Sequence, residues 1–233
     1  PFTLYVSTLR GNKRALLNDH QVRGFIGFLL ITSLLVGTWL YLHSQYGWWE
    51  AFRIVAVNVT SVVTTTGVAL GDYTLWGSFS VLLFFYLTFV GGCSGSTAGG
   101  LKIFRFQVAG ALLMGSLKQL IHPRAVISKK YNNHPIDEDI ARSLLTFSFF
   151  FTITIGAIAL GLGLIGLDWT TALSRAATAV CNVGPGLGSI IGPAGNFSTL
   201  PDSAKWLLTI GMLLGRLEIL TVLVLFIPVF WKY

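Results

Sequence analysis

The sequence predicts an all-α membrane protein made of two similar repeats, and three observations support this fold class. The 233 residues are 53% hydrophobic and only 11% charged, with a mean hydropathy of +0.71. This composition is too apolar for the surface of a soluble domain. Long stretches of the sequence lack charged side chains. The first and the third of these stretches are each followed by the same order of elements, a short helix, a glycine turn and another apolar stretch. A membrane protein with internal repeats follows.

Four candidate spans follow from the positions of the charged residues, because a spanning helix needs roughly 20 mostly apolar residues. The charge-free stretches lie between Arg23 and Glu50, between Asp72 and Lys102, between Arg142 and Asp168, and, interrupted only by Arg216 and Glu218, between Lys205 and Lys232. We therefore expect spans at about residues 25–41, from about residue 75, at about 143–167, and from about residue 206.

The net charge of +7 agrees with a membrane topology and does not require a nucleic-acid partner. Most basic residues lie before the first predicted span, between the second and the third, or after the fourth, and few lie in the other two connections. Successive crossings place these three segments on one side of the membrane, and basic residues are enriched in cytoplasmic segments. We therefore expect both termini and the central segment, residues 102–142, to be cytoplasmic. The flanking basic residues are Arg10, Lys13, Arg14, Arg23, Lys102, Arg105, Lys118, Arg124, Lys129, Lys130, Arg142 and Lys232.

Each predicted repeat contains a short helix followed by a glycine-rich turn between its two spans. The short helices are predicted at residues 48–66 and 169–180, each too short or too polar to cross the membrane. The first glycine turn comprises Thr64, Thr65, Thr66 and Gly67, and the second comprises Cys181, Asn182, Val183 and Gly184. Gly67 and Gly184 are 117 positions apart, as are Leu70 and Leu187, and Gly71 and Gly188.

The chemistry of these two turns favours a cation. Backbone at membrane depth is tolerated only where protein or a water-filled cavity encloses it, so the turns predict a lined cavity. Backbone carbonyls can replace the water shell of a monovalent cation, and glycine permits the backbone conformations that aim successive carbonyls at one axis. Each short helix also directs the negative end of its dipole toward its turn.

The predicted second span contains a glycine-rich loop at residues 91–100, where a helix should be most regular. Its glycines at spacings of four could instead mark tight helix packing. Two glycine pairs and three hydroxyl side chains favour a break in the helix, since glycine costs about 1 kcal/mol per helical position relative to alanine. The loop consists of Gly91, Gly92, Cys93, Ser94, Gly95, Ser96, Thr97, Ala98, Gly99 and Gly100.

Arg216 lies within the last predicted span, two residues before Glu218. Ionisable residues inside a membrane are costly and usually face a cavity or a partner. Residues two apart do not face each other on a helix, so these two side chains should not pair. When the two repeats are aligned at a shift of 120 positions, Gly91 and Gly95 match Gly211 and Gly215, and Arg216 aligns with Ser96.

The stretches TSVVTTTGVALGD, GGCSGSTAGGLKIFR, CNVGPGLGSIIGP and GMLLGRLEILTVLVLF resemble the Trk/Ktr/HKT superfamily of potassium transporters, most closely the last two repeats of the bacterial Trk pore subunit. The resemblance implies a four-repeat, potassium-channel-like pore in which the short helices are pore helices. Each glycine turn would then form one quarter of a selectivity filter that coordinates potassium mainly through backbone carbonyls. The glycine-rich loop and Arg216 would form the gate.

The resemblance also implies what surrounds the chain. The other two repeats of the pore would come from a missing amino-terminal half, and the subunit would form a homodimer in the bacterial inner membrane. A cytosolic nucleotide-binding ring would regulate it through the basic cytoplasmic segment, so no organic cofactor is expected on this chain. Passive conduction and symport with protons or sodium remain alternatives.

The corresponding domain boundaries are a cytoplasmic lead-in at residues 1–23, a pore repeat at 24–122, a cytoplasmic linker at 123–139 and a second pore repeat at 140–233. Two other functions remain open: an alternating-access carrier with broken helices, and a non-conducting scaffold for a cytosolic partner. Catalysis has no support, because no nucleophile and base stand in a recognisable arrangement.

Overall fold

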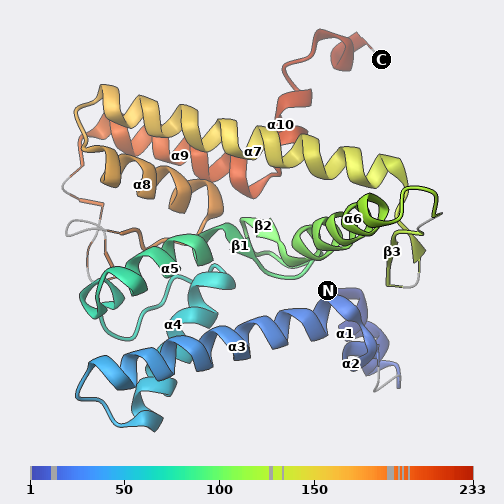
Figure 1. Ribbon diagram of the computed structural model, residues 1–233. Helices are drawn as coiled ribbons and strands as arrows, with labels where there is room; N and C mark the ends of the chain where they lie inside the picture. The colour runs from blue at the N-terminus through green and yellow to red at the C-terminus, as the bar shows by residue number, and fades with distance from the viewer. Residues whose placement is uncertain are drawn as a thin grey trace.

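The computed structural model describes residues 2–11, 15–125, 128–132, 134–187, 192–193, 195, 197–198 and 200–232. The predicted flanking residues Lys13 and Arg14 and the repeat glycine Gly188 lie outside this part of the chain. The described residues form helices almost throughout, joined by two very short strand pairs (Figure 1). The prediction of an all-α protein is confirmed.

The first repeat follows two short helices, α1 (Phe2–Leu9) and α2 (Ala15–Asn18). Its long first helix and its short second helix are the predicted span and pore helix, and its second span is split by two short parallel strands. The elements are α3 (His20–His43), α4 (Trp48–Val63), η1 (Tyr73–Trp76), α5 (Ser78–Phe89), β1 (Val90–Gly91), β2 (Leu101–Lys102) and α6 (Ile103–Ile121).

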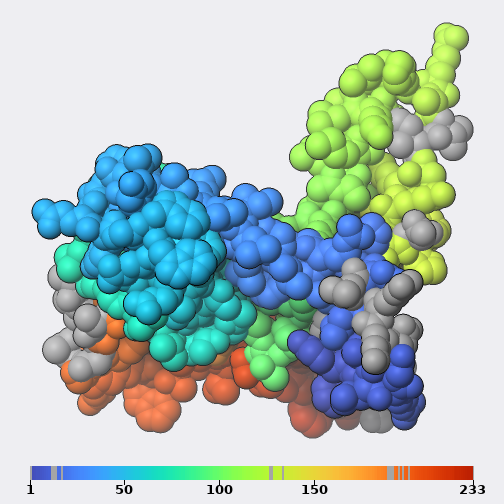
Figure 2. Space-filling model, turned by 90° about the horizontal axis from the view of Figure 1, so that it is seen from below, coloured from blue at the N-terminus to red at the C-terminus, as the bar shows by residue number. Residues whose placement is uncertain are grey.

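A β-hairpin connects the two repeats, and the second repeat has the same order of long helix, short helix and split helix. Figure 2 shows the yellow-green segment around the end of α6 projecting from the body of the molecule. The elements are β3 (Lys130–Tyr131), β4 (His134–Pro135), α7 (Glu138–Leu164), α8 (Trp169–Cys181), α9 (Asp202–Arg216), α10 (Ile219–Val224) and η2 (Pro228–Lys232).

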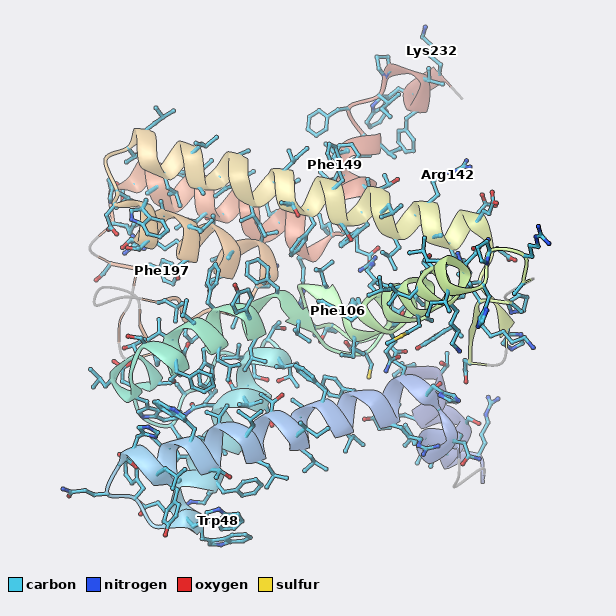
Figure 3. The ribbon with its side chains drawn as sticks, viewed as in Figure 1. Trp48, Phe106, Arg142, Phe149, Phe197 and Lys232 are labelled. Atoms are coloured by element: carbon cyan, nitrogen blue, oxygen red, sulfur yellow. The ribbon has the colours of Figure 1, made fainter. Side chains whose placement is uncertain are left out.

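Among the described residues, two helices are long and apolar enough to cross a membrane. These are α3 and α7, each with a mean hydropathy of 2.0 over its most apolar window. Much of their surface is exposed and apolar, as lipid contact requires: Phe149 of α7 is 62% exposed and lies at the edge of the ribbon in Figure 3. The positions of both helices confirm the spans predicted from charge-free sequence.

The short helix α8 is buried inside this shell of longer helices, whereas α4 is buried on one face. Every residue of α8 from Thr171 to Cys181 except Leu173 is buried, because α8 packs between α7 and α9 and also touches α5. The small side chains of α8, mostly Ala, Ser and Thr, permit this close approach. Helix α4 packs in the same way against α3 and α5.

The last predicted span is not a continuous helix, and this corrects the expectation from its apolar sequence. Helix α9 ends at Arg216, and α10 starts only at Ile219. Between them Glu218 has a φ of +58°, a conformation that does not continue a helix. The break lets Arg216 and Glu218 reach different partners, whereas a continuous apolar helix would leave both charges without one.

Candidate functional site

The two glycine turns have the same backbone geometry. At the end of α4 the amides of Thr65 and Thr66 donate to the carbonyls of Val62 and Ser61, at 3.1 and 2.8 Å. At the end of α8 the amides of the residues 117 positions later donate in the same pattern: Asn182 to Ala179 and Val183 to Thr178, both at 3.1 Å. This pair of bonds is the Schellman ending of a helix. The repeat predicted from a few identities is therefore present at the level of individual hydrogen bonds.

Backbone dihedrals match as well. Thr65 and Asn182 both have a φ of +56°, and the glycines that follow, Gly67 and Gly184, have φ values of +79° and +101°. A left-handed conformation is uncommon for a β-branched residue such as threonine and costs of order 1–3 kcal/mol. Such strain is typical of functional turns.

The two turns lie against each other. A Cβ atom built on Gly67 would come within 2.7 Å of the Val183 carbonyl oxygen, and one built on Gly184 would lie 3.7 Å from the Gly67 Cα. The carboxyl-terminal ends of α4 and α8 therefore meet at one place, and the negative ends of both helix dipoles face it.

Buried side chains of the short helices hold the chain that follows each turn. Asn58 of α4 is 1% exposed, and its amide both donates to the Leu70 carbonyl and accepts from the Leu70 amide, each at 2.8 Å. In α8, Ser174 accepts from the Leu187 amide at 2.7 Å, and Thr178 donates to the Pro185 carbonyl at 2.9 Å. The two repeats thus secure equivalent segments with different residues.

The glycine-rich loop is a break in the second span, as predicted. Strands β1 and β2 pair in parallel through Val90 with Leu101 and Gly91 with Lys102, so the loop leaves the span and returns to it at nearly the same point. Gly91, Gly92, Gly99 and Gly100 are buried in its two stems, whereas its tip, residues 94–97, is exposed.

The second stem of the loop touches both glycine turns. The Gly99 amide donates to Oγ1 of Thr65 at 3.2 Å. A Cβ atom at Gly99 would collide with the carbonyl oxygen of Cys181 and lie 3.1 Å from the Cβ of Asn182. A small residue is therefore required at position 99. Because this stem contacts both turns, a displacement of the stem changes its contacts with each of them.

Two positively charged side chains donate hydrogen bonds to backbone carbonyls of the loop. Arg216 donates from Nη1 to the Thr97 carbonyl. Lys102 donates from Nζ to the carbonyls of Ser96 and Ala98, at 2.9 and 2.8 Å. The carbonyls of three consecutive residues, 96–98, thus each accept a hydrogen bond from a positively charged side chain.

Below the loop, Glu218 faces Arg105 of α6 rather than Arg216. Their charged atoms are 4.0 Å apart, and the Arg105 guanidinium stacks on the ring of Phe147 at 3.6 Å from its centroid. These groups, the loop and Gly215 line a cavity of about 280 Å³. The prediction that Arg216 and Glu218 do not pair is confirmed.

The structure brings together most of the residues singled out in the sequence: both glycine turns, the loop and Arg216. Sequence reasoning missed Lys102, Arg105 and Asn58. The basic pair was assigned to membrane topology, and the signal for Asn58 was a lone amide in an apolar helix. Among the described residues, no three His, Cys, Asp or Glu side chains gather as a metal site would require.

Two broken spans, two short helices that end at one place and a loop that interrupts a span are features of membrane transport proteins. The chain belongs to the TrkH family, described as "Cation transport protein", which matches residues 5–233. The resemblance noted in the sequence is confirmed. Membership in a family of transport proteins also agrees with the expectation that the chain is not an enzyme.

Known relatives include the Trk system potassium uptake protein TrkI of Halomonas elongata, 58% identical over all of this chain and 47% of that protein. The Trk system potassium uptake protein TrkH of Escherichia coli K12 is 32% identical over 99% of this chain and 48% of that protein. The crystal structure of the potassium transporter TrkH from Vibrio parahaemolyticus matches with a TM-score of 0.90 and 32% identity, over 99% of this chain and 49% of that one. The chain spans about half the length of these relatives.

Proposed function

We propose that this chain supplies two of the four repeats of a potassium-uptake pore, with the boundaries expected from the sequence. Residues 64–67 and 181–184 form two quarters of the selectivity filter, and potassium binds there mainly to backbone carbonyls. The observation that carries the proposal is the contact between the two turns, which have matching Schellman endings and φ values. Two further repeats, which would make up the rest of the relatives' length, complete the ring.

The chemistry of the site supports a cation as the transported solute. The carboxyl-terminal ends of α4 and α8 present partial negative charge, and carbonyls replace water around a dehydrated cation without placing a formal charge in the membrane. An anion would instead favour the amino-terminal end of a helix.

The glycine-rich loop is the gate, and Arg216 holds it in the closed position. The loop lies against both turns through Gly99, and its tip is held by Arg216 and Lys102. Breaking the Arg216 bond frees the tip from α9, so the pore opens when the end of α9 moves away from the loop.

The remaining parts of the proposal concern surroundings. The basic end of the molecule, with the projecting end of α6 (Figure 2) and Arg142 (Figure 3), faces the cytoplasm, and both termini lie on that side of the bacterial inner membrane. A cytosolic nucleotide-binding ring docks on the segment between α6 and α7, and the complete subunit assembles as a homodimer.

Rubidium uptake into liposomes that contain the complete four-repeat subunit tests the function. We expect uptake that potassium inhibits more strongly than sodium does, together with an ionic current. Exchange that depends on an organic solute and carries no current would identify an alternating-access carrier instead. A well-folded protein without any flux would identify a scaffold.

A further inference from the structure

Arg175 is a fully buried arginine in the middle of the short helix α8. It is 1% exposed, and its guanidinium nitrogens Nε, Nη1 and Nη2 have no hydrogen-bond partner within the part of the chain that the structure describes. No acidic side chain lies within ion-pair distance of it among the described residues. A buried charge without a partner is costly, and ionisable residues at membrane depth are usually functional.

The repeat symmetry removes the simplest structural explanation. Arg175 lies 117 positions after Asn58, which holds the Leu70 backbone with two hydrogen bonds. In the second repeat Ser174 binds the amide of Leu187, the residue equivalent to Leu70, and Thr178 binds the Pro185 carbonyl. The task of Asn58 is therefore already performed by neighbours of Arg175.

The burial of Arg175 also rules out a partner from another polypeptide. Its side chain is already covered by this chain alone, so a second copy or further repeats have no access to it. With a structural bond and a partner polypeptide both set aside, the remaining role for Arg175 is the electrostatic effect of its charge on nearby groups.

The second glycine turn lies within range of that charge. Arg175 precedes Cys181 by six residues in α8, which corresponds to about 9 Å along a helix axis. At this separation, a full charge changes the affinity for a cation by on the order of 2- to 20-fold, between the limits of a water-like and a protein-like dielectric constant. Little water intervenes to screen it, because both α8 and Val183 are buried.

We propose that Arg175 is a fixed positive charge behind the second glycine turn that lowers the affinity of the filter for potassium and so speeds release of the ion. Conduction requires binding that is weak enough for the ion to leave. A cation beside a row of carbonyls supplies this weakening without touching the ion. The inference rests on the proposed function for the identity of the ion and extends it to the residue that sets its affinity.

The test measures potassium affinity from the rise of the melting temperature with potassium concentration, in the purified complete subunit. Arg175→Met removes the charge and keeps most of the length, whereas Arg175→Lys keeps the charge. We expect R175M to bind potassium roughly 2- to 20-fold more tightly, with R175K unchanged. The exposed arginine Arg53 of α4 provides the matched control, Arg53→Met, whose affinity should equal that of the parent.

Stability gives a second, independent result. Removing an unpaired buried charge should raise the melting temperature without potassium, whereas loss of a structural bond would lower it. Equal potassium affinity in R175M and the parent overturns the inference, as does an equal shift in R175M and R175K, or a parent protein that potassium does not stabilise. Arg175→Gln carries the same test if R175M does not fold. Rubidium flux is measured separately, so a protein that binds potassium without conducting it contradicts the proposed function and not this inference.

Discussion

Arg216 of α9 donates a hydrogen bond to the backbone carbonyl of Thr97, at the tip of the glycine-rich loop. The two residues are 119 positions apart and belong to different repeats. The bond therefore connects the interrupted span of the first repeat to the interrupted span of the second. Its rupture is the simplest event that would free the tip.

Replacement of Arg216 by alanine should increase the basal leak of rubidium from liposomes. The lost hydrogen bond contributes about 0.5–1.5 kcal/mol, which corresponds to roughly a 2- to 10-fold shift toward the open loop. Lys205→Ala is the control, because Lys205 lies on the same helix and its ammonium group pairs with Asp202 of that helix, at 3.0 Å. Equal leak in the Arg216 and Lys205 variants would mean that Arg216 has no role in gating.

Replacement of Gly99 by alanine should displace the loop from both glycine turns, since the new methyl group collides with the Cys181 carbonyl. Overpacking of this kind costs typically about 1–3 kcal/mol, visible as a lower melting temperature and an altered basal flux. Gly163→Ala on α7 is the matched control, because nothing lies within 4 Å of its Cβ position. A Gly99 variant as stable and as tightly closed as the Gly163 variant would refute the contact.

Gly67 and Gly71 separate backbone strain from contact between the turns. Both have positive φ values, +79° and +74°, so alanine at either position should cost about 1–2 kcal/mol in backbone strain. Only at Gly67 would the methyl group also meet the Val183 carbonyl, at 2.7 Å, whereas the space at Gly71 is open. We expect Gly67→Ala to lose selectivity for potassium over sodium and Gly71→Ala to keep it. Loss of selectivity in both variants would assign the effect to strain alone.

Asn58→Ala should loosen the segment after the first turn. The substitution removes both bonds to Leu70, and breaking buried hydrogen bonds lowers the free energy of unfolding by about 1–3 kcal/mol. Thermal unfolding in detergent measures this, with Asn18→Ala as the control because Asn18 is exposed. Unchanged stability in the Asn58 variant would show that the two bonds do not hold the segment.

The hairpin should separate from α6 at high pH. Burial, with the charge of Asp19 as a second cause, raises the pKa of Tyr131 from 10.0 to about 12, and its hydroxyl donates to Oε1 of Gln107 at 2.7 Å. Because the neutral form is favoured in the folded protein, this stabilisation is complete below pH 10 and is lost as the pH rises toward 12. Tyrosinate absorbance should show a group that titrates near pH 12 and is missing from Tyr131→Phe. Titration of all tyrosines together near their ordinary pKa would contradict this.

The sequence predicts the helices and the turns because their signals are local. Charge-free stretches set the spans, glycines mark the turns, and the offset of 117 between Gly67 and Gly184 survives as matching φ values. The break after Arg216 was not predicted, because its sequence is as apolar as a continuous span. Its cause is a set of distant partners, Thr97 for Arg216 and Arg105 for Glu218, which no local pattern contains.

The loop shows the same division between local and distant causes. Its glycine content predicts a break, and strands β1 and β2 confirm one. Its contact with both glycine turns through Gly99 depends on how the two repeats pack. The roles of Lys102 and Asn58 likewise depend on which carbonyls the fold brings to them.

The most direct test of the account is to locate rubidium by anomalous diffraction in crystals of the complete subunit. We predict anomalous density beside the backbone carbonyls of residues 64–67 and 181–184, where the two turns meet, and a loss of this density in Gly67→Ala. Density confined to other parts of the protein, or none at these turns in a subunit that takes up rubidium, would contradict the assignment of the filter.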